Sequence, residues 1–299
     1  MQPFRLAHLS DPHLQPPPGA LRPADFASKR LLSAIAWRRK GREHQPQVLE
    51  ALTTDVAAYA PDHIAVTGDL TNFSTEAEFA AARAWLQTLG SQSDVTLSPG
   101  NHDALVARNA PDSFAPWREW LEDPGDSAFP AVRRRGPVAL VNLCSAIPTA
   151  PWLASGRLGE EQLARLKPIL AQLRQEGLFR VLMIHHPPAA GVVSKRKALE
   201  DAPALRALLG VEGAELILHG HAHEAAVSAL PGPRGAIPVL GVPSASAAGH
   251  GKHPAARWHG IEIDPTQGQR KIRVVARGLS EATSTFEPLG SYVLDAAQG

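Results

Sequence analysis

The sequence has one cysteine, no long apolar run and almost no net charge. The single Cys144 excludes an internal disulfide and a site built from several thiolates, and it fits a reducing compartment. No stretch reaches the roughly 18 apolar residues that a membrane-spanning helix needs. With a formal net charge of +1, the composition provides no electrostatic reason to expect nucleic acid as a partner.

We also expect no secretory signal peptide. The chain enters a strand-like apolar run, Phe4 to Leu9, within its first few residues. We therefore expect a cytoplasmic protein. The 44% of hydrophobic residues and 20% of charged residues are typical of a globular chain. Because no linker or repeat divides the sequence, we expect a single domain over residues 1–299.

Strand-like and helix-like segments alternate along the first two thirds of the chain, which predicts an α/β fold. Thr75 and Glu78 have the spacing of a capping box, and Gly90 ends the helix that they begin. Arg133, Arg134 and Arg135 precede a strand and are expected on a solvated edge. Strands are expected at 4–9, 62–66, 95–97, 138–144, 179–184 and 215–218, helices at 47–59, 75–90, 160–176 and 201–209, and a mostly antiparallel β section at 225–299.

Thirteen histidines stand against the single cysteine, and many of them follow the predicted strands. Five strand-like runs end in groups of polar residues that are metal ligands in proteins. Imidazole and carboxylate suit Zn²⁺, Fe and Mn²⁺, and an amide oxygen suits a hard ion such as Mn²⁺. The groups are Asp11 with His13, Asp69, Asn101 with His102, His185 with His186, and His221 with His223.

These groups resemble the five signature blocks of the calcineurin-like metallophosphoesterases, in the order that the family has them. The blocks are Asp11-Pro12-His13, Gly68-Asp69, Gly100-Asn101-His102-Asp103, His185-His186-Pro187-Pro188 and Gly220-His221-Ala222-His223. The resemblance implies a four-layer α/β/β/α sandwich with two mixed sheets and a dinuclear metal site at the strand ends. It also implies a phosphoric ester hydrolase with two divalent ions, Mn²⁺ first and Fe or Zn²⁺ as alternatives.

The resemblance assigns a ligand role to seven residues. Asp11, His13 and His223 would hold one ion; Asn101, His185 and His221 would hold the other; and Asp69 would bridge the two. His185 is preferred to its neighbour His186, because the family ligand usually lies two residues before the proline of its block.

The expected reaction follows from the chemistry of two neighbouring metal ions. Such a pair lowers the pKa of a shared water, giving a bridging hydroxide, and it clamps the phosphoryl group. His102, beside ligand Asn101, is the candidate general acid for the leaving group. Asp103 is expected either to support catalysis by orienting His102 or to cap a helix.

Residues 22–44 form a basic amphipathic segment that bears on the substrate. Seven Lys and Arg residues stand against two acidic ones, interleaved with apolar residues at roughly helical spacing. Such a segment suits binding to an anionic membrane surface; alternatively, its apolar side packs on the domain, or its arginines clamp a phosphate. It also resembles a bacterial branch of the superfamily that acts on membrane lipids. The candidate substrate-binding residues are Lys29, Arg30, Trp37 and Arg38.

Three functions remain open at this point. The first is a phosphodiesterase acting on phospholipid head groups or glycerophosphodiesters in a phospholipase C-like manner, located in the cytoplasm and in peripheral contact with the inner membrane face. The second is a 3′,5′-cyclic-nucleotide phosphodiesterase acting on cAMP. The third is a metal-binding scaffold without activity, which would predict the loss of His102 or of a ligand.

Overall fold

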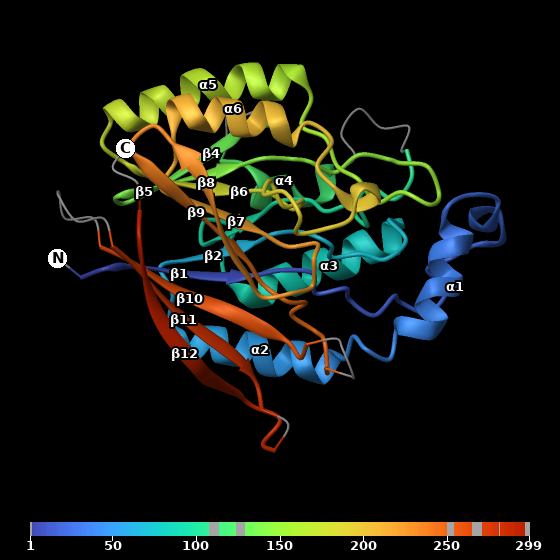
Figure 1. The fold of residues 1–299 in the computed structure, drawn as a ribbon. Helices are drawn as coiled ribbons and strands as arrows, with labels where there is room; N and C mark the ends of the chain where they lie inside the picture. The colour runs from blue at the N-terminus through green and yellow to red at the C-terminus, as the bar shows by residue number, and fades with distance from the viewer. Residues whose placement is uncertain are drawn as a thin grey trace.

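A computed structural model describes residues 2–107, 114–123, 129–249, 254–264, 271–280 and 282–296 (Figure 1). Two six-stranded sheets form its centre. The first has the order β12 (Phe286–Asp295), β11 (Lys271–Leu279), β10 (Arg257–Ile263), β1 (Phe4–Leu9), β2 (His63–Val66) and β3 (Val95–Leu97). The second has the order β4 (Ala131–Arg135), β5 (Val138–Asn142), β6 (Phe179–Met183), β7 (Leu216–His219), β9 (Gly235–Gly241) and β8 (Ala226–Gly232).

Each sheet is mixed. β1, β2 and β3 are parallel in the first sheet, and β5, β6, β7 and β9 are parallel in the second. The flanking strands β10, β11, β12, β4 and β8 pair antiparallel with their neighbours. Within each parallel set, the carboxyl ends of the strands therefore meet at one edge, which is where α/β sheets present functional groups.

Helices cover the outer face of each sheet. α2 (Pro46–Tyr59) and α3 (Glu76–Leu89) share a buried core with the first sheet, and α5 (Glu160–Gln175) and α6 (Ala202–Glu212) share one with the second. A third core, with Leu6, Val181 and Ile261 among its members, joins the inner faces of the two sheets. The predicted four-layer α/β/β/α sandwich is thus confirmed. The remaining helices are α1 (Arg30–Lys40), α4 (Arg118–Leu121) and the 3-10 turns η1 (Pro23–Ala27), η2 (Ala115–Trp117) and η3 (Lys195–Lys197).

Local sequence signals account for several element boundaries. The Thr75 side chain accepts from the backbone of Glu78 and the Glu78 carboxylate accepts from the backbone of Thr75, as the capping-box spacing predicts. α2 begins at Pro46. The N–H groups of the first helical turn have no carbonyl partner within the helix, so a proline at this position loses no hydrogen bond. Pro168 lies inside α5 without ending it.

The prediction for the basic run before β5 is wrong for one residue. Arg133 belongs to strand β4, and its side chain is buried rather than solvated. The guanidinium donates to the carbonyl groups of Gln92, Val95, Glu119 and Glu122. Hydrogen bonds of this kind lower the free-energy cost of burying a charged group. Strand β4 was not predicted, whereas β8 and β12 lie within the antiparallel β section that the sequence predicts at 225–299.

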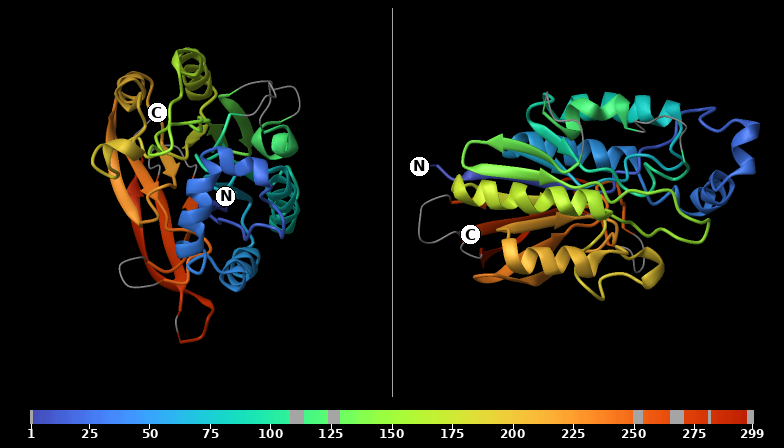
Figure 2. Two further views of the ribbon diagram at one scale, coloured as in Figure 1. Left: turned by 90° about the vertical axis from the view of Figure 1, so that its right-hand side faces the viewer. Right: turned by 90° about the horizontal axis from the view of Figure 1, so that it is seen from above.

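α1 stands apart from the sandwich, at the end of the molecule toward which β1 runs (Figures 1 and 2). It follows the loop that leaves β1 and precedes α2 in the chain. In the part of the chain that the structure describes, no helix is long and apolar enough to cross a membrane.

Candidate metal centre

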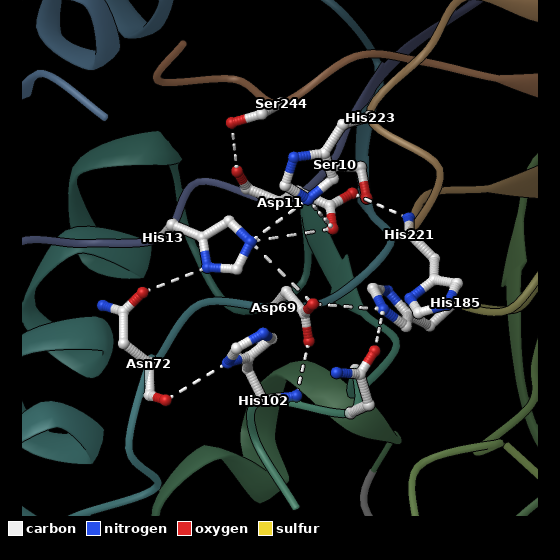
Figure 3. A network of polar contacts seen from close by, with 12 residues as sticks. Ser10, Asp11, His13, Asp69, Asn72, His102, His185, His221, His223 and Ser244 are labelled. Atoms are coloured by element: carbon white, nitrogen blue, oxygen red, sulfur yellow. Dashed lines mark hydrogen bonds and ion pairs between the residues drawn. The ribbon is translucent and has the colours of Figure 1, made fainter. Parts of the chain in front are cut away.

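The loops that follow β1, β2, β3, β6 and β7 converge on one site (Figure 3). Backbone hydrogen bonds hold the loops together: Asp11 N–H donates to Gly68 O at 2.9 Å, and His13 N–H donates to Asp69 O at 3.0 Å. His221 N–H donates to Asp11 Oδ2 at 2.9 Å and thereby joins the second sheet to the first. Residues more than 200 positions apart in the sequence are thus fixed against one another.

Three of the predicted ligands form a first group. His13 Nε2 lies 3.2 Å from His223 Nε2, and His223 Nε2 lies 3.2 Å from Asp11 Oδ1. Asp69 Oδ2 is 3.9 Å from His13 Nε2. Ligands about 2.1 Å from one ion lie roughly 3 to 4 Å from each other, so these separations suit a single divalent ion.

The second group lies on the other side of Asp69. His185 Nε2 is 3.3 Å from Asp69 Oδ2 and 3.2 Å from Asn101 Oδ1. His221 donates from Nε2 to the Lys197 carbonyl, so its Nδ1 is the nitrogen left for a metal. One oxygen of Asp69 therefore lies near both groups, as a bridging carboxylate must.

The geometry distinguishes His185 from His186. His185 directs Nε2 at Asp69 and donates from Nδ1 to the Thr67 carbonyl, which is the arrangement typical of a ligating histidine. His186 instead contacts Ser145 Oγ through Nδ1 at 2.8 Å. Its Nε2 is buried without a hydrogen-bond partner among the described residues, and its ring lies 4.4 Å from that of His221.

The donor set fits divalent metal ions. Asp11 Oδ1 is buried and makes no hydrogen bond of good geometry within the described ranges, although two imidazoles face it. Burial lowers the pKa of His13 and of His221 well below the usual value, which keeps both rings in the neutral, metal-binding form. Burial also acts to lower the pKa of His185, but the Asp69 carboxylate outweighs it and raises that pKa to about 9.

The backbone at the centre is strained. Of the eight described non-glycine residues with positive φ, five are predicted ligands: Asp11, His13, Asp69, His221 and His223. The left-handed conformation costs about 1 kcal/mol for a residue with a side chain. Such strain is typical of functional sites, where the surrounding fold holds a side chain in place.

Gly100 and Gly220 leave room for carboxylates. A Cβ at Gly100 would overlap Asp69 Oδ1, and a Cβ at Gly220 would overlap Asp11 Oδ2 and Ser10 Oγ. Gly100 has no positive φ, so close approach, rather than a special turn, accounts for this glycine.

Asp103 holds the two loops that supply Asp69 and Asn101. Its carboxylate accepts from the backbone N–H groups of Asp69, Leu70, Thr71 and Gly100. Burial and the Asp69 charge raise the pKa of Asp103 to about 7, against the opposing effect of these donors. Among the described residues, the Asp103 carboxylate makes no hydrogen bond to the His102 ring, so Asp103 supports the site through the backbone.

Asn72 was missed in the sequence, although it lies three residues after Asp69. Its Oδ1 accepts from His13 Nδ1 at 3.1 Å, and its carbonyl accepts from His102 Nδ1 at 3.1 Å. One residue therefore orients both a predicted ligand and the candidate general acid (Figure 3). The polar run that continues from Gly68-Asp69 is the signal that could have identified it.

The four candidate substrate-binding residues lie on or beside α1. Lys29 Nζ donates to Thr149 Oγ1 and to the Leu153 carbonyl. Arg30 donates to the Phe73 and Ser74 carbonyls and pairs with Asp25 at 2.6 Å. Trp37 stacks on His44 with ring centroids 5.7 Å apart, whereas Arg38 is exposed to solvent.

Comparison with known protein families matches residues 4–225 to the calcineurin-like phosphoesterases. The chain belongs to this family. A curated protein of Synechococcus, named a probable cyclic nucleotide phosphodiesterase, is 28% identical to the phosphoesterase over 209 residues, which are 69% of this chain and 73% of the relative.

Solved structures share the fold of the phosphoesterase. A dimetal phosphatase from Danio rerio matches at a TM-score of 0.60 with 12% identity, over the whole of both chains. Purple acid phosphatase PPD1 from yellow lupin matches at 0.64 with 12% identity, over 98% of this chain and 53% of the lupin chain. The family and its fold make the phosphoesterase a metal-dependent hydrolase of phosphoric esters, so the scaffold hypothesis is set aside.

Proposed function

We propose that the phosphoesterase hydrolyses phosphodiesters at a dinuclear metal centre. Asp11, His13 and His223 hold one ion, Asn101, His185 and His221 hold the other, and Asp69 is shared. Mn²⁺ is the expected metal, with Fe or Zn²⁺ as alternatives. The observation that carries the assignment is the position of Asp69 Oδ2, 3.9 Å from His13 Nε2 and 3.3 Å from His185 Nε2.

When bound, two divalent ions act as Lewis acids and lower the pKa of a water that they share. The protein positions the remaining groups. The backbone N–H of His102 donates to Asp69 Oδ1 at 2.8 Å and fixes that carboxylate. His102 Nδ1–H is held by the Asn72 carbonyl, so Nε2 is the atom that delivers a proton to the leaving oxygen. Asp103 keeps the Asp69 and Asn101 loops in register through their backbones.

The exposed face of α1 favours an amphiphilic substrate. Phe26 of η1 and Leu31, Leu32 and Ile35 of α1 are between 40% and 51% exposed, so each presents a large part of its apolar side chain to solvent. Helical spacing places Leu31, Ile35 and the exposed Arg38 on one side of α1. Apolar and basic side chains on one exposed face suit the interface of an anionic membrane.

The position of this face supports hydrolysis of phospholipid head groups or glycerophosphodiesters. Trp37, on the inner side of α1, contacts His44, whose ring centroid is 4.6 Å from that of His13. A lipid bound at α1 would thus lie beside the metal centre. We infer a cytoplasmic enzyme in peripheral contact with the inner membrane face, with no nucleic-acid partner.

A substrate screen with Mn²⁺-loaded enzyme tests this proposal. It compares cAMP, glycerophosphocholine, a phosphomonoester, and vesicles of phosphatidylcholine with phosphatidylglycerol. The matched variant is Leu32→Glu/Ile35→Glu, which changes only exposed side chains. We expect vesicle hydrolysis to fall at least about tenfold in this variant, while glycerophosphocholine turnover stays unchanged. Equal vesicle binding and hydrolysis by the variant and the parent protein would eliminate the interfacial role.

Cyclic-nucleotide hydrolysis is the second candidate, favoured by the name of the Synechococcus relative. It requires the same metal centre and the same proton donor, but it gives α1 no part in substrate binding. Its signature in the screen is a kcat/KM for cAMP that exceeds the values for both lipid-derived diesters. In that case Leu32→Glu/Ile35→Glu should retain full cAMP activity.

A further inference from the structure

A tryptophan is exposed on the loop between β5 and α5. The Leu153 N–H donates to the Ala150 carbonyl at 2.9 Å, which closes a β-turn with Pro151 and Trp152 at its two central positions. Proline is favoured at the first of these positions, so the local sequence accounts for the turn. Trp152 is 69% exposed, more than any other large hydrophobic side chain in the described ranges. A single exposed apolar residue needs no explanation, so the surroundings of this turn decide what it indicates.

Hydrogen bonds tie the turn to α1 on one side and to η3 on the other. Lys29 Nζ, just before α1, donates to Thr149 Oγ1 at 2.7 Å and to the Leu153 carbonyl at 2.8 Å. The Ala154 N–H donates to the Arg196 carbonyl in η3 at 3.0 Å. α1, the turn and η3 thus lie together at the end of the molecule toward which β1 runs (Figure 2). The exposed tryptophan therefore shares a surface with the exposed apolar side chains of α1.

η3 brings positive charge to the same surface. Its three residues, Lys195, Arg196 and Lys197, are exposed, and none of them forms a salt bridge with another residue that the structure describes. The Lys197 carbonyl accepts from His221 Nε2 at 2.9 Å, so this segment borders the metal centre. Three consecutive cations without an acidic partner in the described ranges favour an anionic partner at this position.

We propose that Trp152 and η3 form a second contact with an anionic membrane surface, in addition to α1. The indole ring enters the boundary between head groups and acyl chains, and the η3 cations pair with the phosphates of anionic lipids. α1 lies near the group of His13 and η3 near that of His221, so the two contacts border different sides of the metal centre. The inference rests on the function proposed above and adds a contact that α1 does not provide.

Vesicle sedimentation tests the proposal without relying on activity. The vesicles are phosphatidylcholine alone or with phosphatidylglycerol, and the variants are Trp152→Ser and Lys195→Gln/Arg196→Gln. We expect Trp152→Ser to bind both vesicles about tenfold more weakly, because an apolar ring no longer leaves water. The η3 variant should bind at least about tenfold more weakly where phosphatidylglycerol is present, since each cation contributes about fivefold. Lys167→Gln/Lys271→Gln removes the same charge from exposed positions in α5 and β11 and should bind like the parent protein.

Fluorescence quenching reports whether the ring of Trp152 enters the lipid. Vesicles whose acyl chains carry bromine quench only indole rings that reach the chains. At saturating lipid, quenching of the parent protein should be largely lost in Trp152→Ser and kept in the η3 variant. Equal quenching of the parent protein and Trp152→Ser would overturn the insertion of this ring.

The outcomes separate the inference from the function on which it rests. If Leu32→Glu/Ile35→Glu loses vesicle binding while Trp152→Ser and the η3 variant bind like the parent protein, the second contact is wrong and the α1 interface stands. If the parent protein binds neither vesicle, the interfacial role fails as a whole, and glycerophosphocholine turnover still tests the metal centre. An η3 variant with normal vesicle binding but a raised KM for glycerophosphocholine would make these cations a contact of the soluble substrate and overturn the proposal.

Discussion

The metal centre and the α1 segment, residues 22–44, are held in place in opposite ways. Six of the seven proposed ligands are buried and His223 is partly exposed. They follow strands of both sheets, five of them have positive φ, and backbone hydrogen bonds hold their loops together. α1 is attached to the domain through a few side chains, chiefly Lys29, Arg30 and Trp37, and it exposes apolar groups to solvent. The contrast is consistent with our proposal that the sandwich provides the chemistry and that α1 contributes to the choice of substrate.

The largest expected effect concerns the residue that the two metal sites share. Asp69→Asn keeps the shape of the side chain but removes the charge between the two histidine groups. We expect metal content to fall from two ions toward one or none, and kcat/KM for a diester to fall more than about 1000-fold. Metal analysis and steady-state kinetics measure both. Glu76→Gln, an exposed carboxamide substitution in α3, is the matched control and should behave like the parent protein. Near-normal turnover by Asp69→Asn would contradict the bridging role.

The second-largest effect is expected for His102, which lies at the metal centre but is not assigned as a metal ligand. His102→Ala should lower kcat about 100-fold for a diester with a poor leaving group, since the alkoxide must then leave without a proton. The loss should shrink for a p-nitrophenyl diester, whose leaving group needs no proton. Both metal ions should remain bound. Equal losses on the two diesters would argue against proton donation and for a role in positioning Asp69.

Low pH should destabilise the sandwich through two buried histidines, neither of which belongs to the α1 segment. Burial lowers the pKa of His259 to about 4 and, with help from the nearby Arg135 and Arg133, that of His63 to about 3. The unfolded chain takes up these protons near pH 6.5, so it binds more protons than the folded chain between pH 6.5 and about 4. The free energy of unfolding should therefore decrease as the pH is lowered through this range, by about 1.4 kcal/mol per pH unit for each such histidine.

Urea unfolding of chelator-treated protein at pH 8, 6 and 5 measures this slope without interference from metal release. His259→Gln should reduce this slope by about 1.4 kcal/mol per pH unit, which corresponds to one proton. An unchanged unfolding free energy between pH 6 and 5 would show that these histidines are already solvated.

The metal centre could be predicted from the sequence to a greater extent than the packing of the α1 segment. The centre was predictable because each ligand lies in a short motif directly after a strand, and parallel strands bring such ends together. His44 carries no local motif, and only the packing of α1 and the Ser244–Ser246 loop brings it to His13. Arg133 was misjudged because its carbonyl partners come from distant segments.

The sequence also does not predict which side of α1 faces solvent. Periodicity places Leu31 and Ile35 on one side of a helix, but it does not say which side meets the domain. In the structure, Ala34 and Trp37 turn inward together with Arg30, because Phe73, Ser74 and His44 offer partners there. The apolar pair is left in solvent as a consequence.

The smallest expected effect separates two arginines of α1. Arg30→Gln removes bonds to the Phe73 and Ser74 carbonyls, so it should loosen α1 and speed its cleavage by a protease. Arg38 is exposed, and Arg38→Gln should leave cleavage unchanged. It should instead weaken binding to vesicles with phosphatidylglycerol by about 1 kcal/mol, or roughly fivefold, because one cation near an anionic surface contributes about that much. Limited proteolysis and vesicle sedimentation measure the two effects. If Arg30→Gln weakened vesicle binding as Arg38→Gln does, without faster cleavage, the distinction between an anchoring arginine and a membrane-facing one would be lost.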